Sequence, residues 1–514
     1  MPTEYFEQRE RALLGQRYEQ LYAAPQQTAE RGVTVSALRT TPEQFAQRAD
    51  FPLEPSPFCK AAFVVHQPDF KPGRHPYHHA GVFYSQEPSA SSAAPLLGVQ
   101  PGMRVLDLCA APGGKSSQLA AALQGRGVLV SNEYVAARAE ILKSNLERMG
   151  VSNAVVLNET PARIAEALPE FFDRVLVDAP CSGEGMFRKE PVALQQHCEA
   201  LVKQCAELGA QILDCAAAAL APGGQLVYST CTFAPEEDEG QVAAFLQRHP
   251  EFVLADVLGN VDYTFGSAGE ENRTGGLPLD VSKVRRIWPC QGGEGHFMAR
   301  LVKAGTPRAL PAPGEDTPEE QLWLTAAAEA GKKAKGSKPQ KAAKPADARS
   351  ARRENSRACR EAVQGCSSRS REAGAGDASP AQSLAAWREF AEEYFPELAK
   401  RPAVVHGGGV LLPAAFPQTN LHVLRAGVFV GSVQKGRFVP EHHLFTAFGA
   451  LCRNREELTL ADSRTVEYLS GREIEAHTAA DGWCCVTVDG WPLGGGKVSG
   501  GRVKNHYPKA LRLL

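Results

Sequence analysis

The sequence predicts an α/β protein built on a doubly wound parallel sheet, and a strand, a sharp turn and a helix near residue 110 indicate it. Residues 105–108 form a short apolar run, typical of a strand buried on both faces of a parallel sheet. Residues 112–114, Pro-Gly-Gly, break the chain, and residues 115–122 have the composition of a helix. A second strand is predicted at 128–133. Such a fold binds its ligand beyond the carboxyl ends of the strands, over this turn.

The turn at 112–114 is neither G-x-G-x-x-G nor a Walker loop, so a dinucleotide or a nucleoside triphosphate is not the expected ligand. Its glycines let the backbone approach a ligand closely, and the following helix N-terminus supplies free N–H groups. Asp107 ends the first strand and Glu133 ends the second, where an acid commonly binds ribose hydroxyls. We therefore predict a nucleoside-bearing cofactor without a pyrophosphate.

Composition sets broad limits on the protein class. A chain of 514 residues with 43% apolar and 22% charged residues indicates a soluble protein of two to four domains. The net charge of −2 argues against coating nucleic acid by bulk charge. We expect a cytoplasmic protein without membrane segments, because apolar runs are short and no signal-peptide pattern opens the chain. Thirteen cysteines without a C-x-x-C pair, and three histidines within 75–79, do not form a metal pattern.

Strands and helices alternate from residue 102 to about 302. An amphipathic helix at 4–22, with Phe6, Leu13, Leu14 and Leu21 toward a core, is predicted before them. We expect further helices at 134–149, 192–220 and after 235–239, and strands at 154–157, 174–177, 225–229, 287–288 and 296–301. The last two strands are expected to form an antiparallel hairpin at the edge of the sheet. In helix 134–149, the residues at helical spacing are Val135, Arg138, Ile141, Leu142, Leu146 and Met149.

Residues 304–383 change in character, and a second ordered region follows them. Between 325 and 375 there are 13 Lys/Arg against 5 Asp/Glu and almost no large apolar residue, which predicts a flexible basic linker. Short strands are expected near 410–412, 422–424 and 428–433, a helix near 441–452, and a last module from about 456 with a helix at 463–469.

Three motifs together resemble those of the Sun/Nop-type RNA cytosine-C5 methyltransferases. They are Asp107-Leu-Cys-Ala-Ala-Pro-Gly-Gly-Lys115, Asp178-Ala-Pro-Cys181 with its following Ser-Gly, and Thr230-Cys231. The resemblance implies a class I (Rossmann-like) methyltransferase fold with S-adenosyl-L-methionine as cofactor. Many relatives have an adenine-contacting aspartate where this chain has Asn158. The implied cofactor-binding residues are Cys109, Ala110, Ala111, Pro112, Gly113, Gly114, Lys115, Glu133, Arg138, Asn158 and Asp178.

Two cysteines, Cys181 and Cys231, follow predicted strands at the end of the sheet where the site must lie. Cytosine C5 is a weak nucleophile, so a thiolate must first add to C6 and push electron density onto C5. DNA cytosine methyltransferases attack with a Pro-Cys residue, which here is Cys181. The RNA family instead implies attack by Cys231 and product release by Cys181. It further implies that Asp178 holds cytosine N3 and that Lys115 orients the nucleotide and lowers the pKa of Cys231.

The ending at 490–509 resembles the PUA-like RNA-binding domain of the RsmF branch of this family. Lys497, Arg502, Lys504 and Lys509 alternate there with Trp491 and Tyr507, a pattern suited to phosphate contact and base stacking. The implied parts are an N-terminal RNA-recognition extension at 1–92, a catalytic domain at 93–303, the linker at 304–383, an α+β domain at 384–454 and a PUA-like domain at 455–514.

The resemblance also implies a substrate and a state of assembly. The RsmF-like ending favours small-subunit ribosomal RNA, or an assembly intermediate of that subunit, bound by a monomer without a metal ion. Transfer RNA is the alternative substrate. A catalytically silent RNA-binding protein is the alternative class, and it is disfavoured because both cysteines and the cofactor loop are intact.

Overall fold

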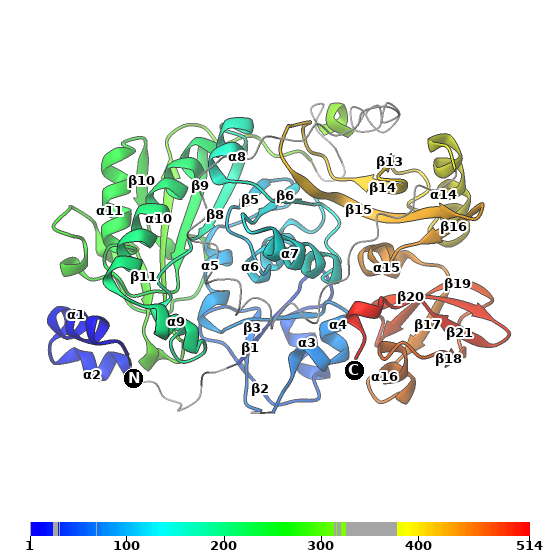
Figure 1. Cartoon of the computed structure of the whole chain (residues 1–514), viewed down its shortest axis with the longest axis horizontal. Helices are drawn as coiled ribbons and strands as arrows, with labels where there is room; N and C mark the ends of the chain where they lie inside the picture. The colour runs from blue at the N-terminus through cyan, green and yellow to red at the C-terminus, as the bar shows by residue number, and fades with distance from the viewer. Residues whose placement is uncertain are drawn as a thin grey trace. The chain divides into compact units, whose positions relative to one another are not determined.

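The chain divides into two compact units, which we describe separately (Figure 1). The computed structural model describes residues 2–23, 29, 31–67, 69–312, 315, 320–324 and 378–513. Unit 1 comprises Met1–Glu320 and Ala414–Gly427, and unit 2 comprises Gln321–Pro413 and Val428–Leu514. The greater part of the linker predicted at 304–383 lies outside the described residues, so that prediction is not tested here.

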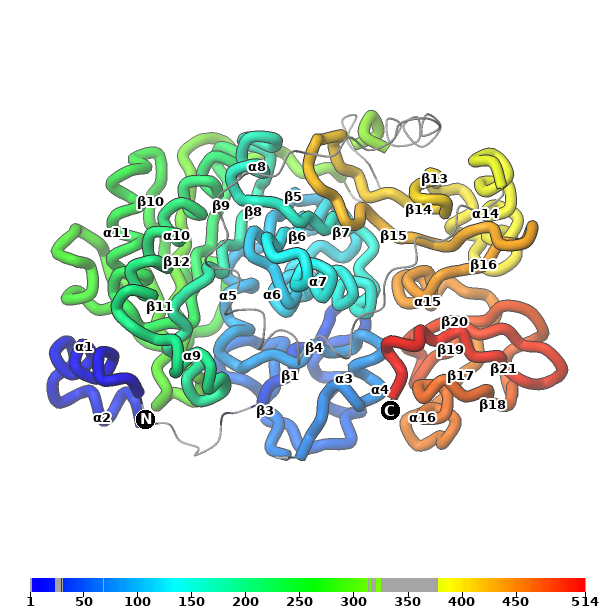
Figure 2. Tube along the Cα trace, viewed as in Figure 1, coloured from blue at the N-terminus to red at the C-terminus, as the bar shows by residue number. Residues whose placement is uncertain are grey.

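A mixed sheet with a parallel centre forms the frame of unit 1, and the Cα trace follows it through the chain (Figure 2). The strand order is β10-β12-β9-β8-β5-β6-β7, and all four pairs from β9 to β7 are parallel. This arrangement confirms the predicted doubly wound fold. The strands are β5 (Arg104–Asp107), β6 (Val128–Asn132), β7 (Ala154–Leu157), β8 (Phe172–Asp178), β9 (Leu220–Thr230), β10 (Phe252–Ala255) and β12 (His296–Lys303).

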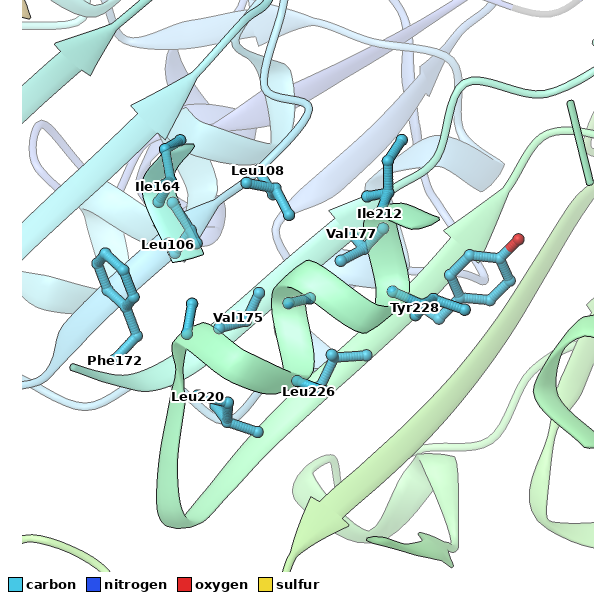
Figure 3. Close-up of a cluster of buried hydrophobic side chains, with 14 of the residues drawn as sticks. Leu106, Leu108, Ile164, Phe172, Val175, Val177, Ile212, Leu220, Leu226 and Tyr228 are labelled. Carbon is cyan, nitrogen blue, oxygen red and sulfur yellow. The ribbon is translucent and has the colours of Figure 1, made fainter. Parts of the chain in front are cut away.

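Helices cover both faces of this sheet because successive residues of its central strands point in opposite directions. Val105 of β5 packs in the core that α5, α6 and α7 cover, whereas Leu106 packs in the opposite core with α8, α10 and α11 (Figure 3). The helices are α5 (Ala93–Leu96), α6 (Gly114–Leu123), α7 (Ala136–Arg148), α8 (Pro161–Ala167), α10 (Glu199–Ala219) and α11 (Glu239–Arg248).

The predicted strand at 154–157 agrees with β7, and the strands predicted at 174–177 and 225–229 lie within β8 and β9. The late hairpin forms between β11 (Arg285–Ile287) and β12. The hairpin lies at the sheet edge as predicted, because β11 pairs with the first residues of β12 on the side away from β9, but it shares this edge with β10, which pairs with the later residues of β12. Strand β10 was not predicted, and its short, partly exposed sequence gives only a weak apolar pattern.

Two predicted helices are interrupted. The helix expected at 4–22 consists of α1 (Glu4–Leu14) and α2 (Arg17–Tyr22), because Gly15 takes a φ of 56° and ends α1. The region expected at 192–220 consists of α9 (Pro191–Gln196) and α10. Between them His197 and Cys198 are extended, and His197 enters a buried polar cluster.

Helix α7 buries a narrower stripe than its sequence pattern predicts. Leu142, Leu146 and Met149 are buried, but Val135 and Ile141 are 44% and 41% exposed. The helix therefore contacts the sheet with one side of the predicted apolar face, and its N-terminal residues remain accessible.

The first hundred residues of unit 1 include a small antiparallel sheet of order β2-β3-β1-β4. Helix α3 (Pro42–Arg48) places Phe45 fully buried among the aromatic residues of this sheet. Tyr84 of β4 donates a hydrogen bond to the carbonyl of Pro112 at 3.1 Å, which ties this part to the glycine turn. The strands and the remaining helix are β1 (Gly32–Val35), β2 (Leu53–Pro55), β3 (Ala62–Val65), β4 (Phe83–Ser85) and α4 (Pro76–His79).

Unit 2 contains a helix and strands around Trp387, followed by a five-stranded sheet of order β17-β19-β20-β21-β18. The helix predicted at 463–469 agrees with α16. Strand β15 (Val423–Gln434) joins the two strands predicted at 422–424 and 428–433 into one, and its first residues belong to unit 1. The other elements are α14 (Pro380–Tyr394), β13 (Val404–His406), β14 (Gly409–Pro413), β16 (Arg437–Pro440), α15 (His442–Phe448), β17 (Arg455–Leu458), α16 (Ser463–Leu469), β18 (Ile474–Glu475), β19 (Gly482–Val488), β20 (Trp491–Ser499) and β21 (Arg502–Asn505).

The prediction that Trp491 and Tyr507 stack on bases is wrong, because both side chains are buried, with exposures of 8% and 1%. A Cβ at Gly495 would lie 2.3 Å from the ring of Phe445, and a Cβ at Gly494 would lie 2.8 Å from the hydroxyl of Tyr468, so these glycines of β20 admit both aromatic side chains into the core of the module. Tyr507 packs against the ring of Tyr468, with the two centroids 5.6 Å apart. The basic residues Arg502 and Lys504 are exposed as expected.

Across the described ranges, helices are either too short or too polar to cross a bilayer.

Candidate active site

The two predicted site cysteines lie together at the carboxyl ends of neighbouring parallel strands. Strands β8 and β9 pair in a register that places Asp178 opposite Ser229, so the loops that follow them meet. The Sγ atoms of Cys181 and Cys231 are 3.3 Å apart, and both residues are partly buried. The N–H of Gly185 donates to the carbonyl of Cys231 at 2.9 Å and joins the two loops directly.

The contact between the thiols affects the protonation of Cys181. The hydrogen bond with Cys231, together with burial, raises the pKa of Cys181 well above its usual value. Cys181 therefore remains a protonated thiol at neutral pH and can donate a hydrogen bond to a thiolate at Cys231. The division between a release residue and a nucleophile stays a prediction.

Lys115 and Asp178 form an ion pair beside the thiols. Lys115 Nζ donates to Asp178 Oδ2 at 2.8 Å, and the hydroxyl of Ser229 donates to Asp178 Oδ1 at 2.8 Å. Burial opposes ionisation of the Asp178 carboxyl, but the charge of Lys115 and these hydrogen bonds lower its pKa below the usual value. Burial also opposes the charge of Lys115, and Asp178 outweighs it and raises the pKa of that amine. Both groups are therefore charged.

His296 at the start of β12 is a site residue that the sequence did not reveal. Its Nε2 lies 3.9 Å from Asp178 Oδ1. Burial and the neighbouring Lys115 lower the pKa of His296 to about 4, so the imidazole is neutral. The pairing of Phe297 with Thr230 places His296 next to Cys231, and only knowledge of this strand register could have found it.

The glycine turn has the backbone geometry that a closely approaching ligand requires. Gly113 precedes α6 with a φ of 115°, a conformation that L side chains rarely adopt, and a Cβ there would lie 3.2 Å from Leu142. Asn145 of α7 donates to the carbonyl of Pro112 at 2.8 Å and holds the turn against that helix. Helix α6 therefore begins directly after a fixed backbone turn whose glycines leave room for a ligand.

Carboxylates surround Cys109 in this turn. Burial and the charges of Asp107, Asp178 and Glu133 raise the pKa of the Cys109 thiol well above its usual value. Glu133 is 5% exposed and accepts the N–H of Val135 at 2.8 Å. Burial raises the pKa of Asp107 to about 7 despite its hydrogen bond from Ser116. A cationic cofactor fits this acidic surrounding.

Arg138 and Asn158 hold the backbone around Glu133. Arg138 donates to the carbonyl of Ala111 at 2.9 Å and lies 3.4 Å from a Glu133 oxygen. The side-chain amide of Asn158 donates to the carbonyls of Glu133 and Tyr134, each at 2.8 Å. Because the amide nitrogen of Asn158 is bonded to these two carbonyls, the predicted hydrogen bond with adenine would have to use the amide oxygen.

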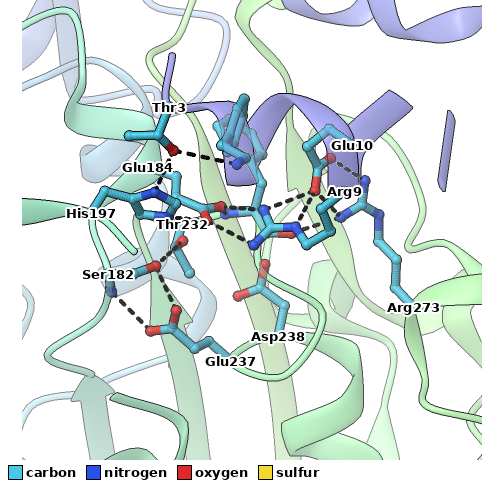
Figure 4. Close-up of polar contacts among 12 residues, drawn as sticks. Thr3, Arg9, Glu10, Ser182, Glu184, His197, Thr232, Glu237, Asp238 and Arg273 are labelled. Carbon is cyan, nitrogen blue, oxygen red and sulfur yellow. Dashed lines mark hydrogen bonds and ion pairs between the residues drawn. The ribbon is translucent and has the colours of Figure 1, made fainter. Parts of the chain in front are cut away.

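A second set of residues that the sequence did not reveal, Ser182, Thr232 and Glu237, joins the two cysteine loops by hydrogen bonds. The hydroxyls of Ser182 and Thr232 are 2.7 Å apart, and the Ser182 N–H donates to Glu237 at 2.9 Å (Figure 4). Burial raises the pKa of Glu237 to about 8, although its hydrogen bonds with Ser182 act in the opposite direction. The sequence contains one signal of this contact: a hydroxyl residue directly follows each cysteine, and hydroxyls at matching positions of neighbouring loops can form a hydrogen bond with each other.

Four family models match successive parts of the chain. The model described as 16S rRNA methyltransferase RsmB/F matches residues 94–302. Three models specific to RsmF match the N-terminal domain at 1–88, the first C-terminal domain at 389–448 and the PUA domain at 455–513. The chain belongs to the RsmB/F family. Membership agrees with the recognised resemblance and with the predicted class I fold and PUA-like ending.

Named relatives of this RsmB/F chain include two proteins called ribosomal RNA small subunit methyltransferase F. The one from Pectobacterium atrosepticum is 36% identical over 306 residues, which are 58% of this chain and 61% of the relative. The one from Cronobacter sakazakii is 37% identical over 301 residues, 57% of this chain and 60% of the relative. The chain thus spans about three fifths of the length of these relatives.

A solved structure supports the fold of the RsmB/F part. The methyltransferase homolog protein from Pyrococcus horikoshii matches with a TM-score of 0.52 and 28% identity, over 59% of this chain and 95% of that chain. S-adenosylmethionine is the cofactor of this methyltransferase family, in agreement with the cofactor predicted from the glycine turn. The described residues hold no group of three or more His, Cys, Asp or Glu side chains arranged for a metal ion.

Proposed function

We propose that this chain methylates C5 of cytosine in small-subunit ribosomal RNA through a covalent bond between Cys231 and cytosine C6. The observation that supports this most is the contact of two thiols, 3.3 Å apart, beside the charged pair of Lys115 and Asp178. C5 methylation needs a nucleophilic thiolate, a second group for release and polar groups for the base. The names of the relatives favour ribosomal RNA of the small subunit as substrate.

The residues around the glycine turn suit S-adenosylmethionine. The backbone at 109–115 would lie along the cofactor, and Glu133 would accept hydrogen bonds from its ribose. Asp178 would provide negative charge for the sulfonium or ammonium group of the cofactor, and Asp107, with its pKa raised to about 7, would add to it as the pH rises through 7. When bound, the cofactor supplies the methyl group.

The first step is addition of the Cys231 thiolate to C6 of the cytosine. A bond forms between sulfur and C6, and the electron pair of the C5–C6 double bond moves toward C5 and N3. N3 becomes more basic, takes up a proton and donates it in a hydrogen bond to the ionised Asp178. The Lys115 ammonium, 2.8 Å from Asp178, is positioned to supply that proton.

Release reverses the addition. After C5 carries its methyl group, it loses its proton to a water molecule, and the electron pair of that C–H bond restores the C5–C6 double bond. The C6–S bond breaks, its electron pair returns to the sulfur of Cys231, and the proton on N3 returns to Lys115. Cys181 is a protonated thiol in contact with this sulfur, and a hydrogen bond from it stabilises the departing thiolate. Cys181 thereby serves release and Cys231 serves attack.

The remaining parts of the chain serve substrate capture in this proposal. We keep the division into parts at 1–92, 93–303, 304–383, 384–454 and 455–514, with RNA bound by the first and the last. The exposed Arg502 and Lys504 of β21 and the partly exposed Lys497 of β20 favour contact with phosphate. We further propose that the chain works in the cytoplasm as a monomer.

Methyl transfer to defined RNA tests the proposal. Tritium from labelled cofactor should enter 16S ribosomal RNA or the small subunit, and bisulfite sequencing should place it on C5 of a cytosine. If transfer RNA were labelled equally well, transfer RNA would replace ribosomal RNA as the proposed substrate. Cofactor binding by calorimetry without methyl transfer to any RNA would support a silent RNA-binding protein instead.

A further inference from the structure

Two consecutive residues of α1 join buried ion pairs that lead to the loop after Cys231 (Figure 4). Arg9 donates to both oxygens of Glu184, at 2.8 and 2.7 Å. Glu10 pairs with Arg273, and both of these side chains are 0% exposed. Charges buried to this degree need hydrogen-bond partners, and these pairs supply them to both carboxylates and to the two terminal nitrogens of Arg273.

The ion pairs hold the backbone of Phe233 from both sides. The N–H of Phe233 donates to Glu184 at 3.1 Å, and Arg273 donates to the carbonyl of Phe233 at 2.7 Å. Phe233 lies two residues after Cys231. Glu184, which binds the N–H of Phe233, is paired with Arg9. Arg273, which binds the carbonyl of Phe233, is paired with Glu10. Both partners lie on α1.

Glu184 also belongs to the loop of the other cysteine, three residues after Cys181. The carboxylate accepts a hydrogen bond from His197 at 2.7 Å, and the second ring nitrogen of His197 lies 2.8 Å from the hydroxyl of Thr3. Thr3 is the N-cap of α1. Burial opposes ionisation of Glu184, but His197 and Arg9 lower its pKa to about 2, so the carboxylate keeps its charge at every physiological pH.

We propose that Arg9, Glu10, Glu184 and Arg273 are positioning residues that clamp the two cysteine loops to α1 and set the contact between the thiols. The proposal rests on the function given above for Cys181 and Cys231. Attack at C6 requires the sulfur within a narrow range of positions, because small displacements of a reacting group reduce rates strongly. Helix α1, which lies outside the predicted catalytic domain, is therefore part of the apparatus that aligns the nucleophile.

A purely structural role must be separated from positioning, because removing one partner of a buried ion pair destabilises a protein. Arg9→Met leaves the Glu184 charge without its main partner. The double variant Arg9→Met with Glu184→Met removes both charges together and should regain stability. It still leaves the Phe233 N–H without its acceptor, so the loop after Cys231 stays loose. Lys203→Met is the matched control, because its ion pair with Glu199 lies on the surface, with exposures of 64% and 56%.

The decisive readout needs neither RNA nor cofactor. Diamide oxidises the two thiols to a disulfide, each thiol losing a proton while the diamide is reduced to its hydrazine, and peptide mapping follows the Cys181–Cys231 bond. At a temperature where every variant is folded, we expect Arg9→Met and the double variant to form it at least fivefold more slowly than the unmodified chain. Lys203→Met should match the unmodified chain.

Single-turnover methyl transfer completes the test. We expect at least a tenfold loss in both α1 variants at saturating RNA, with the dissociation constant of the cofactor changed less than twofold. Unchanged disulfide formation in the folded double variant overturns the proposal, whatever its methyl transfer. If the unmodified chain transfers no methyl group, the proposed function fails, while the disulfide rates still decide whether α1 positions the thiols.

Discussion

Charged residues gather at the cysteine loops of unit 1 and on the last hairpin of unit 2, but they differ in burial and in partners. Around Cys181 and Cys231, Lys115 and Asp178 are paired and mostly shielded from water. On β20 and β21, Lys497 and Lys504 are directly opposite each other, and no ion pair joins either one to a carboxylate among the described residues.

The contrast teaches what each set of charges can do. Buried, paired charges fix orientations and protonation states, so their loss should change a chemical step by orders of magnitude. Like charges opposite each other on an exposed hairpin repel, and an anionic partner relieves that repulsion. We therefore expect large effects on chemistry or cofactor binding in the first region and small, salt-dependent effects on RNA binding in the second.

The largest effect is expected from the thiols themselves. Cys231→Ala should abolish methyl transfer and also any covalent RNA adduct, because no other thiolate is placed to add to C6. Cys181→Ala should still permit addition and methylation but slow release. That variant should therefore remain bonded to RNA, visible as a retarded band on a denaturing gel after incubation with cofactor.

The opposite pattern, an adduct in Cys231→Ala and none in Cys181→Ala, would assign the attack to Cys181. Circular dichroism and cofactor calorimetry should show that both variants are folded and bind the cofactor. Cys215→Ala near the C-terminal end of α10 is the matched control for the loss of a partly buried thiol, and it should not affect adduct formation.

The next effect concerns the cofactor. Glu133→Ala should weaken S-adenosylmethionine binding by more than tenfold, corresponding to about 1.4 kcal/mol or more from a lost charged hydrogen bond. Calorimetry measures it, and Glu140→Ala on the exposed side of α7 is the control for loss of a neighbouring charge. Equal affinities for Glu133→Ala and the unmodified chain would remove Glu133 from the site.

A pH effect of up to about tenfold should come from Asp107. Its pKa is raised to about 7, so the carboxyl is ionised at pH 8 and mostly neutral at pH 6. A cationic ligand loses this attraction as the pH falls through 7, and its dissociation constant should rise. Asp107→Asn should bind more weakly at pH 8 and lack this part of the pH dependence. Parallel pH profiles for the two proteins would show that Asp107 does not contact the charge of the cofactor.

Much of the fold of unit 1 could be predicted, because its central strands are buried on both faces and leave continuous apolar runs such as 154–157. The errors arise where tertiary contacts override local pattern. Gly15 divides the first helix, β10 shares the sheet edge with the late hairpin, and the glycines of β20 admit Phe445 and Tyr468 into a core. A glycine run alone does not distinguish a ligand turn from a close-packed strand.

In the candidate site, too, some residues could be predicted from the sequence and others could not. The thiols, Lys115 and Asp178 lie in motifs at strand ends, so topology alone brings them together once the strands are known. Glu184 and Arg9 were not predicted as partners, because 175 residues separate them and no periodicity links a surface-type helix to a loop glutamate. Only the folded chain shows that both are buried.

The smallest effect is expected at Lys504, and it is the one most dependent on salt. Lys504 faces Lys497, whose ammonium lies 5.7 Å from the ring of Trp483. Lys504→Glu would create an opposite-charge cross-strand pair, so the hairpin should stay folded while one phosphate contact is lost and a repulsion is added. RNA affinity should fall a few-fold at low salt, and the slope of log affinity against log salt should decrease by about 1 or more. Filter binding at several salt concentrations measures both, with Arg455→Glu on β17 as the control for net charge. An unchanged slope would mean that this hairpin does not touch the RNA backbone and that unit 2 contributes to capture by another surface.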